Sequence, residues 1–173
     1  MGKSKELATL TDATTIDIAG DLSVGGLTVG TDQLAIDASG RVTMPYQPSF
    51  HAHAGSTAET AGSVIVYPST FSNVGNHYNT STGVFTAPVA GTYTFYAYCL
   101  RSTNNTRTDM HIRVNGSDWG RSRSHASTTG YYETQTTLLT ITLAANDAVD
   151  AYVAYGTAYC ADRWGGFGGY LIG

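Results

Sequence analysis

The chain has 173 residues, of which 13% are charged, and its formal net charge is −4. This length suits one domain with an appended segment, and the low charge together with many strong β-formers predicts an all-β protein and argues against disorder. A chain of net negative charge without a long basic run lacks the electrostatic footprint of a protein that binds nucleic acid. No apolar run approaches the ~20 residues that span a bilayer, and residues 1–10 lack the apolar stretch of a secretory signal. We therefore expect no nucleic-acid partner and no membrane insertion.

Residues 1–44 differ from the rest of the chain, because short apolar triplets alternate there with turn residues. The triplets IDI, LSV, LTV, LAI and VTM begin at residues 16, 22, 27, 34 and 42. Each triplet places two apolar side chains on one face of a very short strand. Such strands are marginal alone, so we predict that residues 1–44 form a short β-structured arm that trimerises. The alternative interpretation is a disordered leader.

Residues 45–173 are predicted to form the globular head. Pro45 and Pro48 interrupt the triplet pattern and mark the boundary. Beyond them, strands separated by turns are predicted to begin at residues 50, 63, 83, 91, 108, 131, 147 and 164. Asn115-Gly116, directly after the strand at 108, is a strong hairpin signal. Many short strands with turns between them, and no helical periodicity after residue 15, are typical of a β-sandwich or barrel.

The strand from 91 to 101, GTYTFYAYCLR, is apolar or aromatic on both faces. Tyr93 and Phe95 lie on one face, and Tyr96 and Tyr98 lie on the other. A strand of this kind must meet a second layer on each side. We therefore assign Tyr93 and Phe95 to the core, and Tyr96 and Tyr98 to packing between sheet layers or protomers.

No pattern in the chain predicts catalysis. The G-x-S-x-G elbow, the P-loop and the H-E-x-x-H helix are absent from the sequence. Asp147 and Asp150 stand beside a turn, where solvated carboxylates are ordinary, and Glu133 stands alone among polar residues. We predict a protein that is not an enzyme, with no cofactor and no catalytic residue.

His51 and His53 form an H-x-H pair on one face of the strand at 50. In a trimer with this strand near its axis, six imidazoles would converge and bind a transition metal octahedrally. The alternative, which we prefer, is a pair of exposed or hydrogen-bonded histidines on an edge strand, so no metal is assigned.

Cys99 and Cys160 fit neither the zinc nor the thioredoxin spacing. We interpret them as free, buried thiols that pack as small hydrophobes. A Cys99–Cys160 bridge is the alternative if the two strands face each other.

The segment RSRS places Arg121 and Arg123 on one face of a strand, next to Trp119. Arginine and tryptophan are frequent anchors at binding surfaces, so one interpretation is a surface patch for an acidic or sugar ligand. The other, which we prefer, is a solvated edge strand that its charges protect from pairing with other chains.

The spacing of six residues resembles the signature of the globular head of complement component 1q. These residues are Asn73, Tyr78, Phe85, Gly91, Tyr93 and Phe95. Tyr67 stands where the signature has Phe, and Ala97 stands where its last aromatic residue falls. The ending FGGYLIG is similar to the closing strand of that family, and the resemblance spans residues 67–172. It implies a ten-strand jelly roll, as in the tumour-necrosis-factor superfamily, that assembles as a homotrimer. Some of these heads bind calcium, but no matching acids are found here.

The front of the chain has no Gly-X-Y collagen period and is similar to the leaders of structural proteins from marine tailed bacteriophages. This resemblance implies a virion protein, assembled in the host cytoplasm, whose arm contacts other virion proteins. Our leading interpretation is a homotrimeric fibre or spike whose head contacts a glycan or protein of the host surface. One alternative is a capsid decoration protein (head fibre) seated on the shell by the arm. A more distant alternative is a free lectin-like binding module.

Overall fold

The computed structural model describes residues 27–29, 34–36, 39–101, 107–125 and 133–173, and it divides the chain into two compact units, Met1–Thr43 and Met44–Gly173. In the first unit, β1 (Leu27–Val29), β2 (Leu34–Ile36) and β3 (Val42–Thr43) form an antiparallel sheet in the order β1-β2-β3. The triplets at 27, 34 and 42 are therefore strands that pair within one chain. The triplets at 16 and 22 lie outside the described residues, and the trimerising role of the arm stays a prediction.

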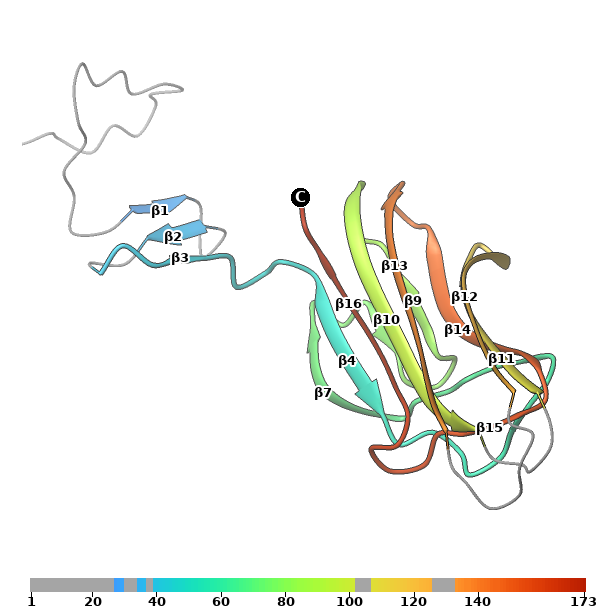
Figure 1. Cartoon of the computed structure of the whole chain (residues 1–173). Helices are drawn as coiled ribbons and strands as arrows, with labels where there is room; N and C mark the ends of the chain where they lie inside the picture. Colours follow the sequence, from blue (N-terminus) through green and yellow to red (C-terminus); the bar gives the residue numbers. More distant parts are fainter. Residues whose placement is uncertain (1–26, 30–33, 37–38, 102–106, 126–132) are drawn as a thin grey trace, which may run out of the picture. The chain divides into compact units, whose positions relative to one another are not determined.

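The second unit, the head, is a sandwich of two antiparallel sheets, and the described residues contain no helix (Figure 1). The prediction of an all-β jelly-roll head is confirmed. No helix in the described ranges is long and apolar enough to cross a membrane.

The first sheet has the order β13-β10-β16-β4-β7, and the short strands β15 and β5 extend it beside the end of β10. Its strands are β4 (Ser49–His53), β5 (Glu59–Thr60), β7 (Ser69–Val74), β10 (Gly91–Arg101), β13 (Thr134–Leu143), β15 (Thr157–Tyr159) and β16 (Gly166–Leu171). The second sheet has the order β12-β11-β14-β9-β8, with β6 also paired to β14. Its strands are β6 (Ser63–Val64), β8 (Tyr78–Asn79), β9 (Val84–Thr86), β11 (Arg107–Val114), β12 (Ser117–His125) and β14 (Ala148–Tyr155).

The core between the sheets is a cluster of aromatic rings. Phe50 of β4 stacks on Tyr78 and Phe85, with ring centroids 4.9 Å and 5.0 Å away, and meets Phe167 edge-on at 5.0 Å. Phe95 lies between Phe85 and Phe167, at 5.5 Å and 6.2 Å. Aromatic pairs at these separations add to the stabilisation from burial. One apolar cluster thus joins five strands: β4, β10 and β16 of the first sheet, and β8 and β9 of the second.

Asn73 and Tyr78, two residues of the six-residue signature described above, make hydrogen bonds where the chain enters this core. The side chain of Asn73 donates to the Tyr78 carbonyl at 2.8 Å, and its oxygen accepts from the Tyr78 amide at 3.1 Å. The Tyr78 hydroxyl in turn accepts from the Tyr67 amide and donates to the Tyr67 carbonyl, each at 3.2 Å. These contacts satisfy buried polar groups at a place where the backbone leaves regular pairing.

The hairpin between β11 and β12 contains an irregularity that shapes the surface described below. Asn115 and Gly116 have φ values of 50° and 77°, as a two-residue hairpin turn requires. Val114 pairs with Ser117 and Arg113 with Asp118, but Ile112 pairs with Gly120. Trp119 is therefore a β-bulge, an extra residue on β12 without an opposite partner.

Candidate functional site

The outer face of the first sheet carries a continuous group of ring side chains and one leucine, which we call the aromatic face. It comprises His51, His53, Phe71, Tyr96, Tyr98, Leu138 and Tyr170. The face is continuous because cross-strand partners point to the same side of a sheet. Tyr96 pairs with Leu138 on one side and with Gly168 on the other, and Gly168 pairs with His51.

Glycines in β16 allow the rings to lie over this strand. A Cβ at Gly168 would come within 2.4 Å of the Tyr96 ring and 2.9 Å of the Phe50 carbonyl oxygen. A Cβ at Gly166 would come within 2.7 Å of the Tyr98 ring. The rings of Tyr96 and Tyr98 thus occupy the space above β16 that side chains would otherwise fill, and they extend toward β4.

His51 lies among these rings. Its ring centroid is 5.1 Å from that of Phe71 and 5.7 Å from that of Tyr96, and its Nε2 atom is 3.5 Å from the Tyr98 hydroxyl. Burial, and then the nearby His53, lower the pKa of His51, so this imidazole is neutral at pH 7. Burial also raises the pKa values of Tyr96 and Tyr98. Both phenols are therefore neutral as well.

Much of the aromatic face is nevertheless open to solvent in a single chain. Leu138 is 68% exposed, Phe71 57% and Tyr170 48%. Contiguous exposed apolar groups of this kind are uncommon on monomeric soluble proteins and mark contact surfaces. The aromatic face is therefore suited to binding another apolar surface.

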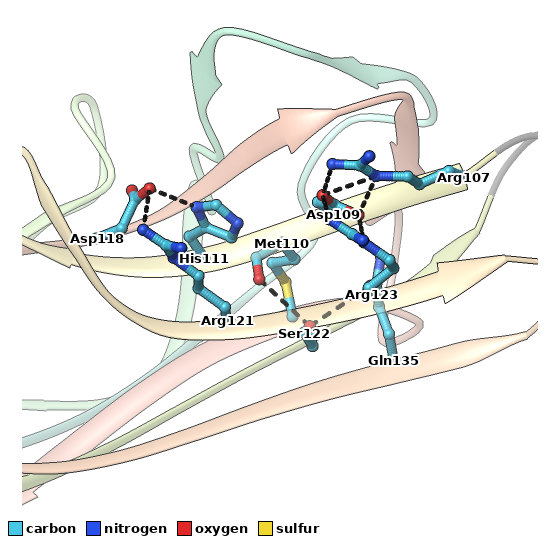
Figure 2. A network of polar contacts seen from close by, with 9 residues as sticks. All are labelled: Arg107, Asp109, Met110, His111, Asp118, Arg121, Ser122, Arg123 and Gln135. Atoms are coloured by element: carbon cyan, nitrogen blue, oxygen red, sulfur yellow. Dashed lines mark hydrogen bonds and ion pairs between the residues drawn. The ribbon is translucent and has the colours of Figure 1, made fainter.

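The outer face of the second sheet is chemically different, because it carries a charged hollow of about 390 Å³, which we call the arginine pocket. Its charged and titratable members are Arg107, Asp109, His111, Asp118, Arg121 and Arg123, all from β11 and β12 (Figure 2). Arg107, Asp109 and His111 alternate with the buried Thr108, Met110 and Ile112, so they share the outer face of β11. Asp109 lies opposite Arg123, and His111 lies opposite Arg121.

Asp109 is the centre of this network. Its carboxylate, with a side chain only 4% exposed, accepts two hydrogen bonds from Arg123, at 2.9 Å from Nε and 3.0 Å from Nη2. Arg107 donates to the same carboxylate, including a bond of 2.8 Å from Nε to Oδ1, as Figure 2 shows. Burial acts to raise the pKa of Asp109, but the hydrogen bonds from Arg107 and Arg123 outweigh it and lower the pKa to about 2. Asp109 is therefore ionised throughout the physiological range.

Asp118 makes a second and more exposed contact. Its Oδ2 atom is 3.0 Å from Nδ1 of His111 and 3.3 Å from Nη2 of Arg121. The Arg121 side chain is 66% exposed and that of Arg123 60%. Exposed ion pairs of this type contribute little to stability, so the guanidinium of Arg121 can exchange Asp118 for another anion at low cost.

The family model for the C1q domain matches residues 49–172. The chain belongs to the C1q domain family. A search of the curated proteins gave no match. Among solved structures, the chain is similar to the globular domain of zebrafish complement 1qA protein, with a TM-score of 0.56 and 15% identity over 73% of this chain and 98% of that chain. At this identity the likeness shows the fold alone. C1q domains are non-enzymatic binding modules that commonly form homotrimers.

The four predicted packing residues of the C1q domain divide between its two faces. Tyr93 and Phe95 are fully buried in the core, and the Tyr93 hydroxyl donates to the Val89 carbonyl at 2.9 Å. Tyr96 and Tyr98 are half-buried on the aromatic face. Their assignment to a contact between protomers stays a prediction.

The structure brings only two of the three predicted patch residues together. Arg121 and Arg123 share the arginine pocket. Trp119, 60% exposed, lines a different hollow with Val114 and Ile141, because the bulge turns its side chain away from the arginines. The interpretation of one patch that includes Trp119 thus differs from the structure.

Sequence reasoning missed the β11 half of the pocket. The signal was present in R-T-D-M-H, where charged and titratable residues occupy every second position and so share one face. Because Arg107 and Asp109 alternate with Thr108 and Met110, they could have been placed on the same face of their strand, beside the side chains of the following strand.

The structure places the predicted histidine pair on β4 and both cysteines in the interior. His51 and His53 lie on one face of β4, and His53 stacks on Phe71 with ring centroids 4.1 Å apart. Within the described part of one chain, no group of three or more His, Cys, Asp or Glu side chains can hold a metal ion.

Cys99 and Cys160 are buried free thiols that interact with each other, at adjoining positions of the β10–β15 pairing.

Proposed function

We propose that the chain is a non-enzymatic structural protein of a bacteriophage virion, in which three copies form a fibre or spike. Residues 1–44 anchor the trimer to other virion proteins, and the head projects outward and contacts a protein or glycan of the host surface. The trimer assembles in the host cytoplasm and is then incorporated into the particle.

The aromatic face is the observation that carries this proposal. An exposed surface of apolar rings needs a partner, and a second and third copy of the same chain supply matching surfaces. The common homotrimeric state of C1q domains supports this partner. The similarity of the arm to leaders of phage structural proteins supports the virion.

The trimer is tested by light scattering on the full-length chain. We expect a mass three times the 18.3 kDa of one chain. The variant Leu138→Lys should give single chains, because the new lysines would place three ammonium groups in the contact. Its circular dichroism should be unchanged, because Leu138 is exposed in one chain. Trp119→Lys, a change at a similarly exposed residue outside the aromatic face, should remain trimeric. A monomer mass for the unmodified chain would refute the trimer.

The virion role is tested on particles. Deletion of residues 1–44 should abolish incorporation of the head, and incorporation of the truncated chain would exclude the anchoring role. Purified head should compete with phage for adsorption to host cells if it contacts the host. Loss of capsid stability without loss of adsorption would instead favour the decoration protein.

A further inference from the structure

The arginine pocket has an excess of positive charge on a chain whose net charge is negative. Three guanidinium groups, from Arg107, Arg121 and Arg123, face two carboxylates, from Asp109 and Asp118. The chain as a whole carries −4. A diffuse attraction for polyanions is therefore absent, and an anion would be held by the local geometry of this pocket.

The buried carboxylate of Asp109 fixes the guanidinium groups in place. It occupies Nε and Nη2 of Arg123, whereas a guanidinium carries five N–H donors in a rigid fork. Arg107 is held by the same carboxylate and by its position over the ring of Tyr155, 4.6 Å from the ring centroid. Side chains that are already ordered lose less entropy when they bind a ligand.

The size and charge of the pocket suit a small acid. A volume of about 390 Å³ lies within the range of small-molecule sites. The tryptophan on which a neutral sugar would stack, Trp119, lines another hollow. Arginine recognises planar or tetrahedral oxyanions through paired hydrogen bonds, so the acid group of the ligand and not its apolar surface is what the pocket recognises.

We propose that the arginine pocket binds a small oxyanion, a carboxylate or a sulfate ester, with Arg121 and Arg123 as the donors. The acid displaces Asp118 from Arg121, while Asp109 continues to hold Arg107 and Arg123. The pocket belongs to the second sheet and the aromatic face to the first, so this site does not depend on the proposed virion role or on trimer assembly.

The test uses three matched monosaccharides on the full-length chain: galacturonate, galactose 6-sulfate and galactose, which differ at carbon 6. Binding is followed by ligand-observed NMR titration at low ionic strength. We expect at least one acidic sugar to bind at least about tenfold more tightly than galactose, since hydrogen bonds between charged groups are stronger than those of the neutral hydroxyl. The stronger of the two acids identifies carboxylate or sulfate as the natural group.

Two variants separate binding from a purely structural network. Arg121→Gln, at an exposed residue, should weaken acid binding about tenfold and leave the melting temperature unchanged. Asp118→Asn should strengthen binding several-fold, because it removes the competing carboxylate, whereas a structural network would gain nothing. Arg163→Gln removes an equal charge outside the pocket and should have no effect. Equal binding of galactose and the acids, or weaker binding by Asp118→Asn, would overturn the proposal. Light scattering on the same samples reports separately on the trimer, so acid binding by a monomeric chain would refute only the proposed assembly.

Discussion

Replacement of Phe95 by Ala is the most direct test of the core. Phe95 is fully buried, and its ring lies 5.5 Å from Phe85, 5.9 Å from Tyr93 and 6.2 Å from Phe167. Truncation removes a buried ring and leaves a cavity that the neighbouring rings cannot fill without leaving their own contacts. Large-to-small aromatic changes of this kind cost about 3–5 kcal/mol. That is a large part of the ~5–15 kcal/mol that stabilises a typical domain.

The measurement is urea denaturation of the full-length chain at one fixed protein concentration, because assembly makes stability depend on concentration. The midpoint should fall in Phe95→Ala, and the melting temperature should fall by roughly 10–20 °C. Trp119→Ala, the truncation of a 60% exposed ring, is the control and should change the free energy of unfolding by less than about 1 kcal/mol. A loss below about 1 kcal/mol for Phe95→Ala would refute its place in the core and the sandwich packing with it.

Three further predictions concern pH, close packing and the thiols. The pKa of Asp109 is lowered to about 2, so the ionised carboxylate stabilises the fold fully above its ordinary pKa near 4, and this contribution is lost as the pH falls from ~4 to ~2. Asp109→Asn should therefore make the free energy of unfolding less dependent on pH in that range. An unchanged acid unfolding profile would exclude this role. Gly169→Ala would place a Cβ 2.4 Å from the Phe95 ring and should cost about 1–3 kcal/mol in urea denaturation, and a neutral result would contradict the close approach. Cys99 and Cys160 should react with a thiol reagent only in denaturant, and rapid reaction of the folded chain would show that they are accessible.

The strands with strong patterns were predictable from the sequence. β10 spans the residues of the predicted strand 91–101, because its aromatic residues on both faces leave little choice of structure. β7, with the sequence STFSNV, was not predicted, since it is mostly polar, half of it is exposed, and β4 is its one partner among the described strands. Edge strands of this kind depend on a neighbouring strand that local sequence does not reveal.

The register of the β11–β12 hairpin could not be predicted from the sequence, and the position of the site depends on it. A regular two-residue hairpin at Asn115-Gly116 would place Arg121 opposite Met110, which is buried, and so turn it toward the core. The bulge at Trp119 shifts the pairing by one residue and puts Arg121 opposite His111 on the outer face. The bulge lies against β13, where Trp119 lines a hollow with Ile141, and no short motif in the sequence indicates it.

The same bulge has a consequence for how this hairpin tolerates changes of length during evolution. Trp119 has no partner on β11, so its deletion would leave Asp118 opposite Arg113 and Gly120 opposite Ile112 in an uninterrupted ladder. Related sequences that lack this residue would therefore keep the same cross-strand neighbours, and an insertion at this point would be absorbed as it is here. The hairpin can gain or lose one residue, and the charged surface that it carries is inherited unchanged.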